Sequence, residues 1–195
     1  MRQRVRDRFC ERLHGDRVLE VGCGPGTDAA AFAARGLRVT ASDYAEDFVR
    51  VVRERYPQLD VRQMDMSRPD LPAQSFDGIY GFACFIHLPR TLSGRALSGL
   101  GELLVPGGLL GLVLVESEKG IREYTIEGWG GDPAVSMLFT CYTQPEIGQR
   151  LLAVGFAEVC FQPVRSPVYD EMPRLLERGI RAYQVFARRP LLSSG

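Results

Sequence analysis

The sequence predicts a single α/β domain in which a mostly parallel sheet is covered by helices. Apolar runs of strand length alternate with helix-like segments, which is the pattern of parallel strands joined by crossover helices. A glycine-rich turn joins the first of these strands to the helix that follows it. The chain has 195 residues and neither an internal repeat nor a low-complexity linker, so one domain over 1–195 is expected.

The individual elements follow from apolar periodicity and from residues that start or stop helices. Acidic residues open the segment 45–57, arginines close it and Pro57 ends it, as the helix dipole favours. Thr27 or Asp28 is a suitable N-cap for the second helix, and Gly36 a suitable stop. Helices are expected over 3–13, 28–36, 45–57, 90–105 and 144–156. Strands are expected over 17–22, 38–43, 60–65, 75–84, 109–117, 157–164 and 181–189.

The segment 117–142 interrupts this alternation. It is rich in glycine and aromatic residues and shows no clear helix or strand period. Long irregular segments in compact domains are usually functional loops. We therefore expect an irregular insertion that covers the substrate, with Trp129 and Tyr142 as substrate-contacting residues, the alternative being a flap whose aromatic residues only pack.

Composition limits the classes of function. The chain has 24 basic and 24 acidic residues, and a balanced charge argues against a nucleic-acid partner. Its five cysteines are scattered and it has only two histidines, so neither a metal site nor a disulfide framework is expected. The charged first 17 residues and the lack of a long apolar run predict no signal peptide and no membrane segment, hence a cytoplasmic protein.

The glycine-rich turn predicts a ligand site at the start of a helix. Gly22, Gly24 and Gly26 lie between an apolar strand and an alanine-rich helix, where unpaired N–H groups and missing side chains admit a ligand. Asp43 ends the next strand, about 20 residues further on, where a carboxylate accepts hydrogen bonds from a ribose. The alternative for the glycines alone is a tight turn without a ligand.

The segment from Glu20 to Gly26 resembles the E/D-x-G-x-G-x-G motif of class I S-adenosylmethionine-dependent methyltransferases, in particular the small-molecule branch with type 11 and type 25 domains. A dehydrogenase turn instead reads G-x-G-x-x-G. The resemblance continues along almost the whole chain. It implies a Rossmann-like, doubly wound, mostly parallel seven-stranded sheet whose last strand is antiparallel.

The resemblance also implies the cofactor, S-adenosyl-L-methionine, its product S-adenosyl-L-homocysteine, and the residues that hold them. Glu20 is expected near the methionine ammonium, the alternative being a strand-end acid that caps nearby N–H groups. Asp43 and Tyr44 correspond to the ribose and adenine contacts, Asp65 and Met66 to the adenine edge, and the strand containing Phe82 passes beneath the methionine. The expected cofactor-binding residues are Glu20, Gly22, Cys23, Gly24, Gly26, Asp43, Tyr44, Asp65, Met66 and Phe82.

His87 is the candidate catalytic base. It follows the fourth strand, where the family places residues that face the acceptor, and its ordinary pKa is near neutral. The alternative is a histidine that only packs or bonds to backbone. Ala83 precedes Cys84 where a base methyltransferase with a nucleophilic cysteine has proline, and "GFACF" replaces an Asp/Asn-Pro-Pro-aromatic motif. Both departures argue against methylation of DNA bases.

These observations together predict an enzyme that methylates an oxygen, nitrogen or carbon atom of a small-molecule acceptor. A monomer or homodimer is expected, without nucleic acid or membrane as a partner. A nicotinamide-dependent oxidoreductase is a different class of enzyme that the glycine spacing disfavours. A non-catalytic, methyltransferase-like binding module and an RNA methyltransferase are further alternatives, and balanced charge disfavours the last.

Overall fold

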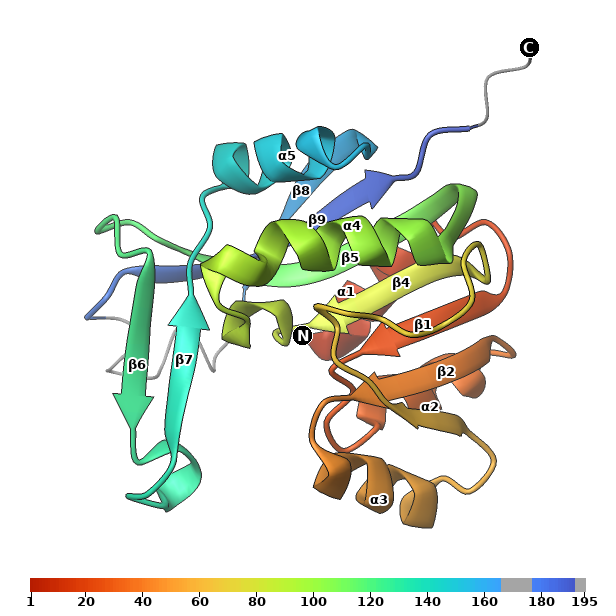
Figure 1. The fold of residues 1–195 in the computed structure, drawn as a ribbon, viewed down its shortest axis with the longest axis horizontal. Coiled ribbons are helices and arrows are strands. Elements are labelled where there is room, and N and C mark those ends of the chain that lie inside the picture. The colour runs from red at the N-terminus through yellow and green to blue at the C-terminus, as the bar shows by residue number, and fades with distance from the viewer. Residues whose placement is uncertain (166–176, 192–195) are drawn as a thin grey trace.

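The computed structural model describes residues 1–165 and 177–191, and it contains the predicted seven-stranded sheet (Figure 1). The strands lie in the order β3-β2-β1-β4-β5-β9-β8. Neighbouring strands are parallel except β9, which is antiparallel to both β5 and β8. The fold class is therefore confirmed. The strands are β1 (Arg17–Val21), β2 (Arg38–Asp43), β3 (Asp60–Gln63), β4 (Phe76–Phe82), β5 (Leu104–Ser117), β8 (Ala157–Val164) and β9 (Ile180–Arg188).

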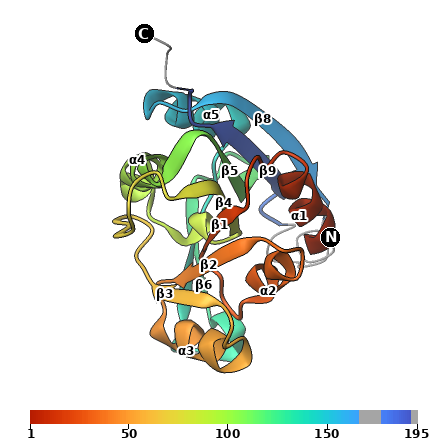
Figure 2. The ribbon, with the colours of Figure 1, turned by 90° about the vertical axis from the view of Figure 1, so that its right-hand side faces the viewer.

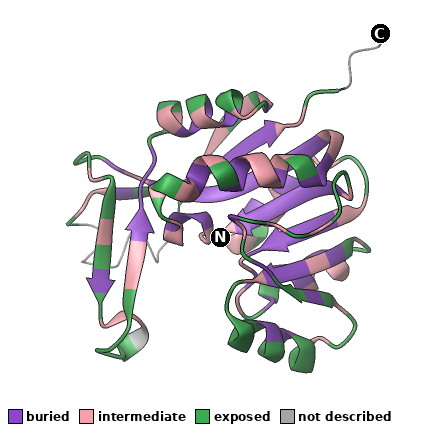
Figure 3. Cartoon of the chain, in the orientation of Figure 1, coloured by how far each residue is buried: buried purple, intermediate pink, exposed green. Residues whose placement is uncertain are grey.

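Helices cover both faces of this sheet. Figure 2 shows α4 on one side and α1 and α2 on the other. At the two ends of the sheet, α3 packs against β2 and β3, and α5 against β8. The strands are mostly buried and the outer helix faces exposed (Figure 3). The helices are α1 (Arg2–Cys10), α2 (Thr27–Ala33), α3 (Glu46–Arg55), α4 (Ser93–Leu103) and α5 (Gln144–Ala153).

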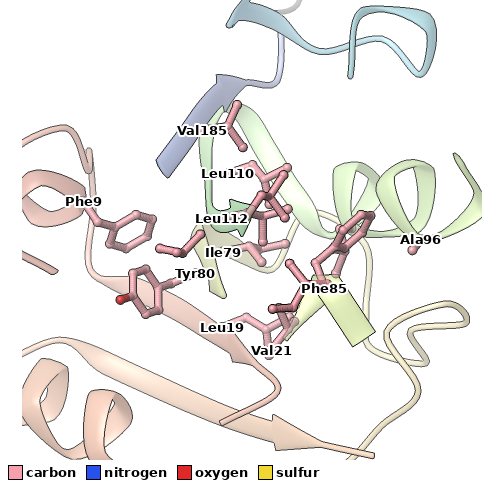
Figure 4. Packing of buried hydrophobic residues seen from close by; sticks show 14 of the residues in the cluster. Phe9, Leu19, Val21, Ile79, Tyr80, Phe85, Ala96, Leu110, Leu112 and Val185 are labelled. Atoms are coloured by element: carbon pink, nitrogen blue, oxygen red, sulfur yellow. The ribbon is translucent and has the colours of Figure 1, made fainter. Parts of the chain in front are cut away.

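Phe9 packs helix α1 against the central strands of the sheet. Figure 4 shows the ring of Phe9 beside that of Tyr80. The centroid of the Phe9 ring lies 5.3 Å from that of Tyr80 and 5.7 Å from that of Phe32, and both neighbours are buried. A Cβ added at Gly78 or Gly111 would come within 2.8 Å of a Phe9 ring atom. Glycine at these two positions, one on β4 and one on β5, therefore leaves room for the ring of Phe9 against the sheet.

The segment 117–142 differs from the irregular insertion that the sequence predicts. It forms a two-stranded antiparallel hairpin of β6 (Glu123–Glu127) and β7 (Ser136–Thr140), with the short 3-10 turn η3 (Trp129–Gly131) in its connection. Figure 1 shows the hairpin standing apart from the main sheet, with the arrows of β1 and β4 pointing toward it. Cross-strand pairing stabilises these two short strands. The glycine-rich connection between them obscures any alternation of apolar and polar residues that would predict strands from the sequence.

Some boundaries also differ from the expected ones. The strand expected over 109–117 begins at Leu104, so Pro106 and the two glycines that follow it are part of β5. The helix expected over 90–105 is divided into the 3-10 turn η2 (Arg90–Leu92) and α4. None of the helices among the described residues is long and apolar enough to cross a membrane.

Candidate cofactor and acceptor site

The three glycines between β1 and α2 have different environments. Gly22, Gly24 and Gly26 have φ values of 63°, 52° and 78°, in the left-handed region that favours glycine. A Cβ at Gly22 would lie 2.2 Å from the Cβ of Cys84, and one at Gly26 would lie 2.9 Å from the methyl groups of Val52. A Cβ at Gly24 would meet nothing within 4 Å. Packing thus accounts for the outer two glycines, and only Gly24 faces open space.

Asp43, at the end of β2, connects its strand to this turn. Its Oδ2 accepts a hydrogen bond of 2.8 Å from the Gly24 N–H, and its Oδ1 accepts one of 3.0 Å from the Ala45 N–H. A carboxylate has about four acceptor positions, so two bonds leave capacity for a ligand. Asp43 therefore lies at the turn, as predicted, and also stabilises its conformation.

Glu20 is a buried acid with an unsatisfied oxygen. The residue is 1% exposed, and its Oε2 has no hydrogen-bond partner among the described residues. Burial raises the pKa of the Glu20 carboxyl well above its ordinary value, and the nearby Asp28 raises it further. Arg2 and the N–H of Ala29 oppose this rise in pKa. Because a buried polar atom without a partner costs about 1–3 kcal/mol, this oxygen is suited to a cationic or donating ligand group.

Helix α1 contributes residues to this region that the sequence analysis missed. Asp28 is fully buried and accepts hydrogen bonds from the guanidinium groups of Arg2 and Arg6. The N-cap of α2 is Gly26, so neither expected cap has that role. The Arg2 guanidinium also lies 4.4 Å from the centroid of the Phe82 ring, at the end of β4. Arg2 and Arg6 are 26 and 22 residues away from Asp28 in the sequence, so no local sequence pattern predicts these contacts.

A hollow of about 260 Å³ lies beside the ends of β2 and β3. Tyr44, Met64, Asp65 and Arg68 are among its lining residues, and Tyr44 is 73% exposed. Met66 is not among the lining residues and packs instead against the core. The expected third strand, 60–65, ends at Gln63, so Asp65 lies in the loop after it. Its Oδ1 accepts a 2.8 Å hydrogen bond from the Ser67 N–H.

The two cysteines nearest the turn are not reactive thiols. Cys23 is 2% exposed, and burial, with Glu20 nearby, raises the pKa of its thiol. Burial likewise raises the pKa of the Cys84 thiol to about 12, and its Sγ donates to the Val21 carbonyl at 3.0 Å. Thiolates are the reactive form, so the side chains of both cysteines serve as packing groups.

His87 ends the 3-10 turn η1 (Phe85–His87) and faces the hairpin. Its Nδ1 lies 2.8 Å from the Leu138 carbonyl oxygen on β7. A carbonyl only accepts, so Nδ1 carries the proton and Nε2 has the lone pair in the neutral ring. Burial lowers the pKa of His87, more than the bond to Leu138 raises it. The geometry therefore fixes one tautomer of a neutral imidazole.

Known proteins resemble this chain in sequence and in structure. A family model described as a methyltransferase domain matches residues 18–108. A probable S-adenosylmethionine-dependent methyltransferase of Mycolicibacterium smegmatis is 36% identical over 105 residues, which is 54% of this chain and 40% of that protein. A ubiquinone biosynthesis O-methyltransferase of Xanthomonas campestris is 38% identical over 105 residues, 50% of this chain and 42% of that protein. The chain therefore spans about two fifths of the length of these relatives.

A solved structure extends the similarity over most of the fold. The 1,6-didemethyltoxoflavin-N1-methyltransferase of Burkholderia thailandensis, with bound 1,6-didemethyltoxoflavin and S-adenosylhomocysteine, has a TM-score of 0.67 and 26% identity. The similarity covers 91% of this chain and 72% of that one. In sequence over residues 18–108, and in fold over most of its length, the chain is therefore similar to S-adenosylmethionine-dependent methyltransferases.

An aromatic cluster faces His87 from the hairpin. The rings of Tyr124, Trp129 and His87 all lie 4.9–5.1 Å from that of Phe139, centroid to centroid. Phe139 is 3% exposed and central, whereas Trp129 is partly exposed at the end of the hairpin. The side chain of Trp129 is therefore accessible, as contact with a substrate would require.

Tyr142 has a different place from the one expected for a substrate residue. It is fully buried, and its ring contacts that of Phe85 at a centroid distance of 6.0 Å. The guanidinium groups of Arg90 and Arg150 lie 4.6 and 5.7 Å from the centroid of the Tyr142 ring. Because the side chain has no exposed surface, we correct its assignment from substrate contact to packing at the base of the hairpin.

Hydrogen bonds connect the base of the hairpin to the loop after β4. Arg90 donates from its side chain to the Cys141 carbonyl at 2.6 Å and from its backbone to Glu123 at 3.0 Å. The Thr140 hydroxyl donates to the Leu88 carbonyl at 2.9 Å. Together with the bond of His87 to Leu138, these contacts make the loop and the hairpin one packed unit.

Proposed function

We propose that the chain binds S-adenosyl-L-methionine and transfers its methyl group to a small-molecule acceptor. The observation that carries this proposal is the unsatisfied Oε2 of Glu20, buried beside a turn whose central residue, Gly24, faces open space. A cofactor with an ammonium group at Glu20 and its backbone beside Gly24 would satisfy both features.

Each part of the cofactor has a candidate partner on the chain. Asp43 would accept from the ribose hydroxyls with its free acceptor positions, while it continues to hold the Gly24 N–H. The hollow lined by Tyr44 and Asp65 would take the adenine, and the Phe82 ring would lie beneath the methionine part. When bound, this cofactor supplies an already activated methyl group, so the chain mainly supplies proximity and alignment.

His87 would act as the base where the acceptor starts protonated. The Leu138 carbonyl holds the proton on Nδ1, which leaves the Nε2 lone pair to receive a proton from the acceptor. The lowered pKa keeps the ring neutral at physiological pH. An oxygen, nitrogen or carbon acceptor is compatible with this arrangement.

The hairpin segment 117–142 would cover the acceptor. Trp129 offers a partly exposed aromatic surface next to the cluster that holds His87, and such surfaces suit planar or apolar molecules. The relatives named for ubiquinone biosynthesis and for toxoflavin support a small-molecule acceptor rather than a nucleic acid. We further propose a cytoplasmic monomer or homodimer, in line with five free cysteines and a balanced charge.

Calorimetric titration tests cofactor binding directly. We expect the protein to bind S-adenosylhomocysteine and not NADH. Glu20→Gln should weaken binding about 10–100-fold, because a hydrogen bond to a charged group contributes about 1.5–3 kcal/mol. Asp77→Asn is the matched control, a largely buried carboxylate that is paired with Arg17 at 2.7 Å. Binding of NADH without a response to S-adenosylhomocysteine would refute the proposal.

The ionisation of Glu20 gives a second readout. In the free protein, burial holds the pKa of Glu20 well above its ordinary value. An adjacent ammonium favours the charged form and lowers that pKa, so binding should release a proton. The affinity should then rise with pH through the free-state pKa, and this dependence should disappear in Glu20→Gln. An identical pH dependence in both proteins would remove Glu20 from the site.

A turnover screen separates an enzyme from a non-catalytic binding module. Candidate phenols, amines and activated carbon acids are offered with the cofactor, and S-adenosylhomocysteine is measured. Formation of methylated product with any class supports catalysis. Tight cofactor binding without turnover across all three classes would favour the binding module.

A further inference from the structure

A basic hollow lies between α1 and the end of β8, outside the residues assigned to the cofactor. Its volume is about 580 Å³. Arg4 and Arg8 line it from α1, and Arg165 lines it from the residue after β8. No acidic residue is among its lining residues in the described part of the chain. Three guanidinium groups therefore share one concave surface.

Within the part of the chain that the structure describes, no acidic side chain neutralises the positive charge of this hollow. Arg4 and Arg165 are exposed, and within residues 1–165 and 177–191 neither makes an ion pair or a side-chain hydrogen bond. Arg8 donates from one nitrogen to the Pro163 carbonyl at 2.9 Å. Nearby acids are engaged elsewhere, since Asp7 pairs with Arg35 and Asp28 with Arg2 and Arg6.

The hollow opens at the same edge of the sheet as the proposed acceptor position. Val164 on β8 is in register with Ala182 on β9, which pairs with Val115 on β5. Phe82, the last residue of β4, pairs with Val113, two residues earlier on β5. The ends of β4 and β8 are separated by three strand spacings, roughly 14 Å, since neighbouring strands lie about 4.8 Å apart.

We propose that this hollow binds an oxyanion group, a phosphate or a carboxylate. The planar guanidinium matches both groups because its paired N–H donors fit two oxygen atoms at once. The group can belong to the methyl acceptor, which would then be an elongated acid, or to a separate small anion. The site itself follows from its arginines and does not require methyl transfer, whereas its link to the acceptor rests on the proposed function.

Titration with pyrophosphate at low ionic strength tests the site without cofactor or turnover. We expect saturable binding to the whole chain, weakened at least tenfold in the double variant Arg4→Gln/Arg165→Gln. Arg95→Gln is the matched control, an exposed arginine on α4 at the opposite face of the sheet. Because the substituted residues Arg4, Arg165 and Arg95 are all exposed, the melting temperature of these variants should be unchanged. No binding of pyrophosphate, or equal binding in the double variant, would overturn the proposal.

A second experiment distinguishes the two sources of the anion. Pyrophosphate is added to the methylation assay and its inhibition pattern is measured. Competition with the acceptor supports an acidic acceptor, and the double variant should then raise KM for acceptors with an acid group and not for uncharged analogues. Binding of pyrophosphate without competition supports a separate anion site. If the protein binds pyrophosphate but neither cofactor nor any acceptor, the proposed function fails and the anion site remains.

Discussion

The proposed cofactor side and the proposed acceptor side of this molecule are built in different ways. On the cofactor side, Glu20, Gly24 and Asp43 lie at the ends of adjacent parallel strands, within one β-α-β unit of the chain. On the acceptor side, His87 meets Leu138, 51 residues away, and Arg90 meets Cys141, also 51 residues away. The first site depends on local connectivity and the second on the docking of a hairpin. Substitutions on one side should therefore leave the ligand affinity of the other side largely unchanged.

The largest expected effect comes from Gly24→Val. The variant places a branched side chain in the left-handed region, at φ 52°, in the open space proposed for the cofactor. We expect binding of S-adenosylhomocysteine to weaken by at least about 100-fold, or about 2.7 kcal/mol, in calorimetric titration. Gly36→Val is the control, because Gly36 has φ 84° and an equally open Cβ position, at the far end of α2. Equal loss of affinity in both variants would indicate backbone strain alone.

His87→Gln tests the acceptor side in isolation. We expect kcat to fall about 100-fold, the low end of the effect of losing a general base, with cofactor affinity unchanged. Because burial lowers the pKa of His87, the parent rate should fall only when the pH drops below the ordinary histidine pKa of about 6.5. This acid limb should be absent in the variant. His14→Gln is the control, and an unchanged rate and pH profile in His87→Gln would leave His87 as a packing residue.

Asp43→Ala should have an intermediate effect on the cofactor side. The variant removes the acceptor of the Gly24 and Ala45 N–H groups as well as the proposed ribose contact. The expected loss is about 1–3 kcal/mol, or about 5–150-fold in the dissociation constant of S-adenosylhomocysteine. Asp47→Ala, which removes an exposed carboxylate paired with Arg50, should bind like the parent. Full affinity in Asp43→Ala would place the ribose elsewhere.

Trp129→Ala should have the smallest effect. Removal of its partly exposed ring leaves the contacts of Phe139 with Tyr124 and His87 in place. We therefore expect an approximately 5–10-fold rise in KM for the acceptor, about 1–1.4 kcal/mol. Cofactor affinity should not change. Trp129→Phe should recover most of the acceptor affinity, because it retains an aromatic surface. A weakened cofactor affinity in Trp129→Ala would show that the two sides are not independent.

Much of the fold could be predicted because its elements are specified locally. The central strands β1, β4 and β5 are largely apolar runs. Helix α3 carries dipole-compatible charges in its own sequence, and Pro57 follows it directly. The hairpin of β6 and β7 could not be predicted as easily. Its strands are five residues each, and pairing with one another, rather than a continuous apolar run, stabilises them.

The sequence by itself determined the sheet and the positions of Glu20, Gly24 and Asp43, because consecutive strand ends meet at one edge of a parallel sheet. Only the tertiary structure decided which glycine faces open space, since Cys84 and Val52 come from other elements. It also decided that Tyr142 is buried and that the Leu138 carbonyl holds one tautomer of His87. These features depend on contacts between distant parts of the chain, and no local periodicity or propensity encodes such contacts.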